Sequence, residues 1–276
     1  MGGLFHKLRH PRRCYVVCTI PRSGSNLLTD GLRATRRAGM PKQFFLPKFE
    51  ARYGAELGVD PVADYPKYVR GIVITRVTHN EVFGFKLMSW YLDDFLTRLR
   101  NTRAFGDAAT DDLALLRNAF PRLRFVHIHR RHKLRQALST ARALQTGLWK
   151  VQKAATVIQE PQFDAELIEQ SLREAERQEK IWRDFFQRLG IEAFRVQYEE
   201  LCQDYERTIR SVANNTRIDG EEFLAEAVRI PIVTHTQVFE FNEANEALIA
   251  LKTDAIRGAG VLNIALENSA GKYKNP

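Results

Sequence analysis

Hydrophobic positions along this chain fall into two kinds of group: short apolar runs and longer amphipathic stretches. The short runs are rich in β-branched and aromatic residues, which predicts buried strands. They occupy residues 15–20, 83–88, 124–129 and 194–198. The longer stretches repeat their apolar positions at helical spacing. They occupy residues 91–100, 108–118, 133–148 and 164–189, and an earlier one carries Leu27, Leu28 and Leu32 at helical spacing. Strands that alternate with helices predict an α/β fold with a central, mostly parallel sheet flanked by helices.

Residues 42–67 break this alternation. Four aromatic residues lie in the first half of the segment, at Phe44, Phe45, Phe49 and Tyr53. Their side chains either fill the core or form one wall of a substrate cleft, since binding pockets are commonly apolar with few polar anchors. The same part of the chain contains Pro47, Pro61 and Pro66. These prolines predict an irregular segment over residues 47–67 with at most short helices.

A small polar loop joins the first predicted strand to the first predicted helix. Pro21 ends the strand, and the loop Arg22–Asn26 contains one arginine, one glycine and three short polar residues. Such a unit directs backbone N–H groups and the positive end of a helix dipole at one point, which suits a phosphate or sulfate group. The loop matches neither the Walker A pattern nor the dinucleotide-binding glycine pattern. The alternative is an ordinary turn with Ser25 or Asn26 as the N-cap.

A second anion site is predicted where the third strand ends. Arg131 follows that strand and Ser139 lies eight residues later on the next helix, so a guanidinium and a hydroxyl can hold one anion. Alternatively, Arg131 covers a sheet edge and Ser139 has no ligand. His127 and His129 share one strand face, but no third ligand is evident, so we expect core or rim histidines and no metal.

Composition narrows the class of protein further. A formal net charge of +9 favours anionic partners, although the basic residues are scattered along the chain. Three cysteines without a C-x-x-C spacing suggest neither a disulfide framework nor a zinc site, and favour a reducing cytoplasm. No apolar run reaches the length of a membrane span. Residues 1–13 are basic and lack the apolar stretch of a signal peptide, so we expect a flexible leader.

Four stretches of the sequence resemble the bacterial trehalose 2-sulfotransferase family. They are YVVCTIPRSGSNLL at 15–28, FGFKLM at 83–88, RFVHIHRRHKLRQALSTARALQTGLW at 124–149 and IWRDFFQRLGIEAFRVQYEEL at 181–201. The third is the most specific of the four. The resemblance implies a P-loop-like three-layer α/β fold, the donor 3′-phosphoadenosine-5′-phosphosulfate (PAPS), and a sugar or glycolipid acceptor. Family members are often homodimers. We expect the sulfotransferase domain to span residues 14–257. The tail at 258–276 is rich in glycine, asparagine and lysine, and this composition predicts a loose segment.

The resemblance also implies roles for individual residues. The first loop would cradle the 5′-phosphosulfate, with Arg22 stabilising the charge that builds up on the leaving nucleotide during transfer. Arg131 and Ser139 would hold the 3′-phosphate, and Tyr198 would approach the adenine. The donor-binding residues implied are therefore Arg22, Ser23, Gly24, Ser25, Asn26, Leu27, Arg131, Ser139 and Tyr198.

The sequence departs from the family at the expected general base. Family members read Pro-x-Glu-aromatic-Phe after the first helix, whereas this chain has Gln43 in place of that glutamate. A glutamine side chain orients a hydroxyl but is not a useful proton acceptor. Glu50 and His79 are the alternative bases. Where the family usually has an aspartate after the paired arginines, this chain has His132.

Two other functions compete with sulfuryl transfer. Gln43 motivates a catalytically weak protein that binds PAPS or another nucleotide. The net charge motivates a nucleic-acid-binding protein, but the chain shows no recognisable motif of that class, so we expect no nucleic-acid partner. A kinase is disfavoured because the sequence has no Walker lysine.

Overall fold

The computed structural model describes residues 10–149, 160–216, 236–240, 243, 246, 250 and 259–263. The chain divides into two compact units, residues 1–229 and 230–276. The predicted leader at residues 1–13 lies mostly outside the described residues.

Four parallel strands form the sheet of the first unit, in the order β2-β1-β3-β4. Their bounds are β1 Arg13–Thr19, β2 Val82–Met88, β3 Arg124–His129 and β4 Phe194–Gln197. Cys18 of β1 pairs with Leu87 of β2 on one side and His127 of β3 on the other. The four predicted strands and the parallel sheet are confirmed.

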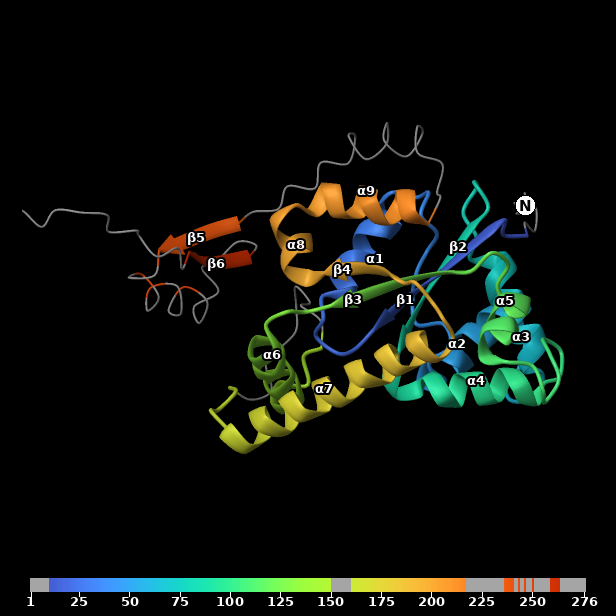
Figure 1. Cartoon of the computed structure of the whole chain (residues 1–276), viewed down its shortest axis with the longest axis horizontal. Coiled ribbons are helices and arrows are strands. Elements are labelled where there is room, and N and C mark those ends of the chain that lie inside the picture. Colours follow the sequence, from blue (N-terminus) through green and yellow to red (C-terminus); the bar gives the residue numbers. More distant parts are fainter. Residues whose placement is uncertain are drawn as a thin grey trace, which may run out of the picture. The chain divides into compact units, whose positions relative to one another are not determined.

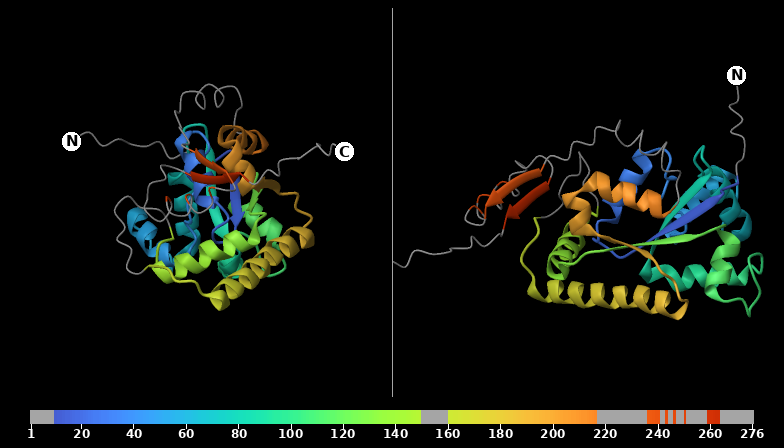
Figure 2. Two further views of the ribbon diagram at one scale, coloured as in Figure 1. Left: turned by 90° about the vertical axis from the view of Figure 1, so that its left-hand side faces the viewer. Right: turned by 45° about the horizontal axis from the view of Figure 1, so that its top comes forward.

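Alternation along the buried strands supplies two apolar faces. Val16 and Cys18 of β1 face a core that includes Trp182, whereas Tyr15 and Val17 face a second core that includes Leu28. Figures 1 and 2 show the helices on both sides of the sheet, with α7 on one side and α1, α8 and α9 on the other. The result is a three-layer α/β/α arrangement.

The helices of the first unit follow the predicted periodicity in most places. Asp111, Asp164 and Asp204 each cap a helix with their side chains. The bounds are α1 Ser25–Ala34, α2 Pro47–Leu57, α3 Tyr65–Thr75, η1 Ser89–Tyr91, α4 Leu92–Asn101, α5 Asp112–Ala119, α6 Lys133–Thr146, α7 Ala165–Arg188, α8 Tyr198–Gln203 and α9 Tyr205–Asn215.

The prediction of an irregular segment over residues 47–67 is wrong. Helix α2 has 11 residues and begins at Pro47, and α3 has 11 residues with Pro66 in its first turn. Proline is well tolerated there because the first N–H groups of a helix have no partner within the helix. These two prolines therefore begin helices, and only Pro61 lies in the connection between them.

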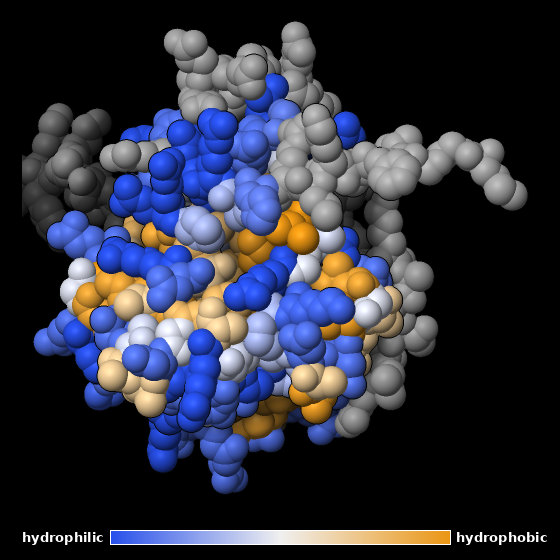
Figure 3. Space-filling model, turned by 90° about the vertical axis from the view of Figure 1, so that its right-hand side faces the viewer, coloured by the Kyte–Doolittle hydropathy of each residue, from blue (hydrophilic) through white to orange (hydrophobic). Residues whose placement is uncertain are grey.

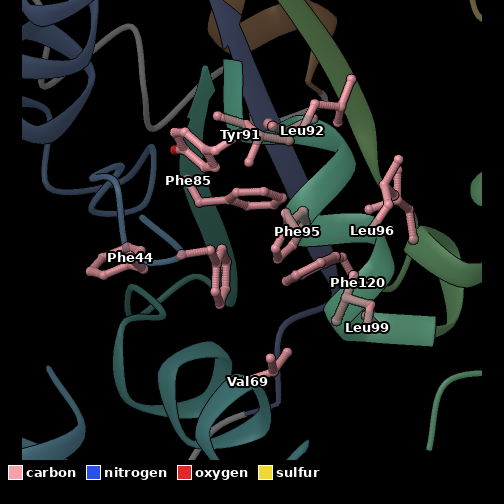
Figure 4. Close-up of a cluster of buried hydrophobic side chains, with 14 of the residues drawn as sticks. Phe44, Val69, Phe85, Tyr91, Leu92, Phe95, Leu96, Leu99 and Phe120 are labelled. Carbon is pink, nitrogen blue, oxygen red and sulfur yellow. The ribbon is translucent and has the colours of Figure 1, made fainter. Parts of the chain in front are cut away.

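The aromatic residues before α2 fill the core. Phe44 and Phe45 are buried, and the Phe45 ring centroid lies 5.0 Å from that of Phe95. Phe85 and Phe120 pack 4.6 Å apart in the same cluster, part of which is drawn in Figure 4. The core alternative is thus confirmed for Phe44 and Phe45. Aromatic pairs of this kind add about 0.5–1.5 kcal/mol beyond their buried area.

The second unit contains two described strands, β5 Thr236–Glu240 and β6 Ala259–Asn263, which pair in parallel. Strand β6 lies inside the tail that was expected to be loose, so that expectation is wrong for these residues. Residues 264–276 lie outside the described part of the chain. The predicted division at residue 258 stays a prediction.

Among the described helices, none is both long enough and apolar enough to cross a membrane. Figure 3 shows the face on the right-hand side of Figure 1, where hydrophilic residues surround smaller apolar areas.

Candidate active site

The loop between β1 and α1 has an unusual backbone. Arg22 has a φ of 59° and Gly24 a φ of 88°, both in the left-handed region. Gly24 is the N-cap of α1 and no side chain caps the helix, so the N-cap role considered for Ser25 or Asn26 is wrong. The first amides of α1 therefore have no side-chain acceptor, which is the condition under which a helix N-terminus binds an anion.

Tyr198, the first residue of α8, packs directly against this loop. A Cβ on Gly24 would lie 2.1 Å from Cδ2 of Tyr198, so only glycine fits. The Arg130 guanidinium lies 4.6 Å from the centroid of the same ring. Burial raises the pKa of Tyr198 to about 12, so its hydroxyl stays protonated. The residue expected near adenine thus also fixes the loop backbone.

Arg22 connects the loop to α6. Its Nε donates to Oγ of Ser139 at 2.8 Å, and its NH1 donates to the carbonyl of Trp149 at 2.7 Å. Burial lowers the pKa of Arg22, and the neighbouring Arg130 lowers it further. The structure therefore brings together two of the predicted donor-binding residues, which lie 117 positions apart in the sequence.

Lys86 is a site residue that sequence reasoning missed. It is 7 % exposed on β2, and its Nζ donates to Oδ1 of Asn26 at 2.6 Å. The backbone N–H of Lys86 donates to the carbonyl of Lys42, which places the neighbouring Gln43 beside this strand. A lysine inside the apolar run FGFKLM was the available signal, because a buried charge needs a partner.

The other loop residues contribute less through their side chains. Ser23 is fully buried and its Oγ lies 2.5 Å from Oγ1 of Thr19, so its hydroxyl points into the protein. Ser25 is also buried, whereas Leu27 is partly exposed. Ser23 and Ser25 can therefore meet an anion chiefly through their backbone N–H groups.

Arg131 and Ser139 have different surroundings. The backbone N–H groups of Arg131 and His132 donate to the two carboxylate oxygens of Glu199, at 3.1 and 3.0 Å. The Arg131 side chain is exposed, while Ser139 accepts from Arg22. A shared anion between Arg131 and Ser139 stays a prediction.

Comparison with known proteins identifies the family. A sequence model of the Stf0 sulphotransferases matches residues 14–238, from the first strand into β5. The chain belongs to the Stf0 sulphotransferase family.

Two curated relatives of this Stf0 sulphotransferase are called trehalose 2-sulfotransferase. The one from Mycobacterium tuberculosis is 29 % identical over 225 residues, covering 72 % of this chain and 82 % of the relative. The one from Mycolicibacterium smegmatis is 28 % identical over 228 residues, covering 74 % of this chain and 83 % of the relative.

The alternative bases of this Stf0 sulphotransferase, Glu50 and His79, lie on other elements than the loop Arg22–Asn26. Glu50 pairs with Arg98 at 2.6 Å and accepts from the Tyr65 hydroxyl at 3.3 Å. Burial raises the pKa of Glu50, against the effect of Arg98. Glu50 lines a cavity of about 650 Å³ with residues of α2, of the connection between α2 and α3, and of α4, and no residue of the loop Arg22–Asn26 lines it. His79 precedes β2 at the amino edge of the sheet, whereas Arg22 follows β1 at the carboxyl edge.

The histidine pair lies on a different surface of the Stf0 domain. Burial lowers the pKa of His127 to about 3, and the His127 and His129 rings lie 5.9 Å apart. Both line a cavity of about 640 Å³ together with Arg183 and Arg195. In the part of the chain that the structure describes, no group of three or more His, Cys, Asp or Glu side chains is arranged to hold a metal ion.

Proposed function

We propose that this protein transfers a sulfuryl group from PAPS to a hydroxyl of a carbohydrate or glycolipid acceptor. The observation that carries the proposal is a cation on each side of the uncapped N-terminus of α1, in a member of a sulphotransferase family. Arg22 lies in the loop before this helix, and Lys86 bonds Asn26 in its first turn. A cation in the loop, a second cation on the first turn of the helix and the backbone N–H groups between them match the charge of a phosphosulfate.

The donor is assigned to the loop and to the elements that contact it. Residues 22–27 and Lys86 receive the 5′-phosphosulfate, and Arg131 with Ser139 receives the 3′-phosphate. Tyr198 and Arg130 form the wall that the adenine approaches. In this arrangement Ser139 keeps accepting from Arg22 while its own hydroxyl hydrogen is donated to the nucleotide, since a hydroxyl donates as well as accepts.

The transfer step requires little covalent work from the protein. The acceptor oxygen forms a bond to sulfur while the bond between sulfur and the bridging phosphate oxygen breaks, and the electron pair stays on the nucleotide. Arg22 and Lys86 stabilise the charge on that leaving oxygen, as cations do in phosphoryl transfer. The acceptor proton must pass to a base. Gln43 beside Lys86 orients the acceptor hydroxyl but does not supply that base.

A trehalose-like sugar is the acceptor that the names of the two curated relatives suggest. Gln43 is the specific observation for the second candidate function, a catalytically weak protein that binds PAPS or another nucleotide. The described cysteines Cys14, Cys18 and Cys202 are free, which supports a cytoplasmic reaction.

Two measurements test the proposal together. Calorimetry should show much tighter binding of 3′-phosphoadenosine 5′-phosphate than of 5′-AMP, because only the first carries the 3′-phosphate assigned to Arg131 and Ser139, and removing one partner of a charge pair weakens binding. Incubation with PAPS labelled in the sulfuryl group should then label a sugar from a panel that includes trehalose. Tight binding without any labelled sugar would favour the weak nucleotide-binding protein. Equal affinity for the two nucleotides would rule out the assigned donor site.

A further inference from the structure

Gln136 is a buried polar residue of α6 that neither the motif analysis nor the donor assignment uses. Its side chain is fully buried, and its Nε2 donates to the carbonyl of Pro21 at 2.7 Å. The two residues are 115 positions apart. This hydrogen bond therefore joins α6 to the residue directly before Arg22.

The amide of Gln136 has an energetic cost. Its Oε1 is buried and has no hydrogen-bond partner among the residues that the structure describes. An unsatisfied buried acceptor costs about 1–3 kcal/mol. A methionine would fill a similar volume without that cost. Packing alone therefore does not explain a glutamine at this position, whereas its hydrogen bond to the loop does.

The residue that follows Pro21 is held in a strained conformation. A left-handed conformation costs a non-glycine residue about 1–2 kcal/mol, and Arg22 adopts it. Such strain persists where surrounding contacts fix the backbone. Three contacts from one direction do so here: Gln136 to the Pro21 carbonyl, and Arg22 to Ser139 and to the Trp149 carbonyl.

We propose that Gln136 is a positioning residue, which holds the Pro21 carbonyl so that Arg22 keeps its left-handed backbone and its guanidinium stays directed at the transferred group. The inference rests on the proposed function for its kinetic consequence. Gln136 touches neither donor nor acceptor and acts through Arg22. Misplacing a reacting group by about 1 Å lowers rates by up to about 100-fold, which sets the expected size of the effect.

The first test replaces the amide by an isosteric apolar side chain. Gln136→Met should lower kcat by about 10- to 100-fold while the KM for PAPS changes by less than about threefold, because binding still uses the helix amides and Lys86. Its melting temperature should stay close to that of the wild type, since the unsatisfied Oε1 is gone while the Pro21 carbonyl loses its donor. Gln178→Met is the matched control: Gln178 is a buried glutamine on α7 whose side chain accepts from Ser89 and donates to Glu174, and not to the Pro21 carbonyl. It should keep the wild-type kcat.

A double-mutant cycle separates positioning from a general structural effect. In an Arg22→Ala background, Gln136→Met should produce no further loss, because the group that Gln136 positions is absent. A further 10-fold loss in that background would overturn the proposal, as would a Gln136→Met protein with the kcat of the wild type.

Amide hydrogen exchange provides a readout that does not depend on turnover. The peptide that spans residues 20–26 should exchange faster in Gln136→Met than in the wild type or in Gln178→Met. If the wild type transfers no sulfuryl group to any acceptor, the proposed function fails, and this exchange experiment still decides the role of Gln136. Unchanged exchange of the loop would show that Gln136 does not hold it.

Discussion

Arg22 combines a strained backbone with a side chain that reaches another helix, and this combination determines what the loop after β1 presents to a ligand. The sequence predicted that Arg22 follows a buried strand. Its partners were not predicted, because Ser139 and Trp149 lie more than a hundred positions away. Lys86 was missed for the same reason: its neighbour Asn26 belongs to another element.

Arg22→Ala should lower kcat/KM by about 100-fold, corresponding to about 3 kcal/mol of transition-state stabilisation, because it removes a charge at the transferring group. Steady-state kinetics with labelled PAPS measure the loss of kcat/KM, and thermal unfolding checks that the variant keeps its fold. Arg36→Ala is the control, since Arg36 is also a left-handed arginine but lies beyond α1 and is exposed. Equal rates for the two variants would contradict the assignment of Arg22.

Gln43→Glu should raise the rate on trehalose by at least about tenfold, because it restores a carboxylate beside Lys86 at the position where the family has its base. The structure favours this outcome over the alternative bases, since Glu50 is paired with Arg98 and His79 lies at the other edge of the sheet. Rate against pH for both proteins is the measurement. If Glu50→Gln abolishes transfer while Gln43→Glu has no effect, Glu50 is the base.

At the scale of elements, periodicity located the strands well because each is short and centred on apolar residues, and β1 and β2 are buried on both faces. Helices α4, α6 and α7 were predicted equally well, since their apolar positions repeat regularly. Helices α2 and α3 were missed because prolines were interpreted as breaks, although proline at the first turn of a helix replaces an N–H that has no partner. The pattern of apolar residues along a segment therefore predicts whether it forms a helix or a strand. Which residues of two such segments touch each other becomes known only from the folded structure.

The packing of α8 against the loop leads to a prediction about Gly24. An alanine in the left-handed conformation costs about 1–2 kcal/mol. Gly24→Ala should lower the free energy of unfolding by more than this, because its Cβ would also displace the Tyr198 ring. Affinity for 3′-phosphoadenosine 5′-phosphate should fall at least about tenfold with the loop displaced, roughly 1.4 kcal/mol. Urea unfolding and calorimetry measure these changes.

The matched control is Gly190→Ala. Gly190 also has a positive φ, 59°, but nothing lies within 4 Å of the added Cβ. The difference between the two variants isolates the contact with Tyr198. If both lose the same stability and both bind the nucleotide normally, the ring does not constrain the loop.

At the scale of the whole first unit, the strand order explains why one loop gathers residues from so many elements. Strand β1 lies between β2 and β3, and all strands are parallel, so the carboxyl ends meet at one edge. Lys86 comes from β2, Arg130 follows β3, and Tyr198 follows β4. The sequence predicted this edge through its strand-loop-helix unit, and the resemblance implied Tyr198, but neither pointed to Lys86 or Arg130.

Acid should destabilise the fold through His127. Its pKa of about 3 in the folded protein lies below the ordinary value of 6.5, so between these values the unfolded chain binds a proton that the folded chain does not. The free energy of unfolding therefore falls as pH drops below 6.5, by about 3 kcal/mol from this group at pH 4. Urea unfolding at pH 7 and pH 4 should show a smaller loss for His127→Phe than for the wild type. His132→Phe, at an exposed position, controls for the loss of one imidazole, and equal losses in all three proteins would contradict the role of His127.

The bond between the Trp182 indole and the carbonyl of Thr19 has a practical consequence. Trp182 is fully buried directly beneath the end of β1, whereas the two other tryptophans, Trp90 and Trp149, are 51 % and 45 % exposed. A Trp90→Phe/Trp149→Phe protein would therefore contain a single tryptophan, Trp182, which is hydrogen-bonded to the last residue of β1. The backbone carbonyl at position 149, which accepts from Arg22, would remain. Its emission should shift when 3′-phosphoadenosine 5′-phosphate enters the loop, so stopped-flow fluorescence would time donor binding without any label.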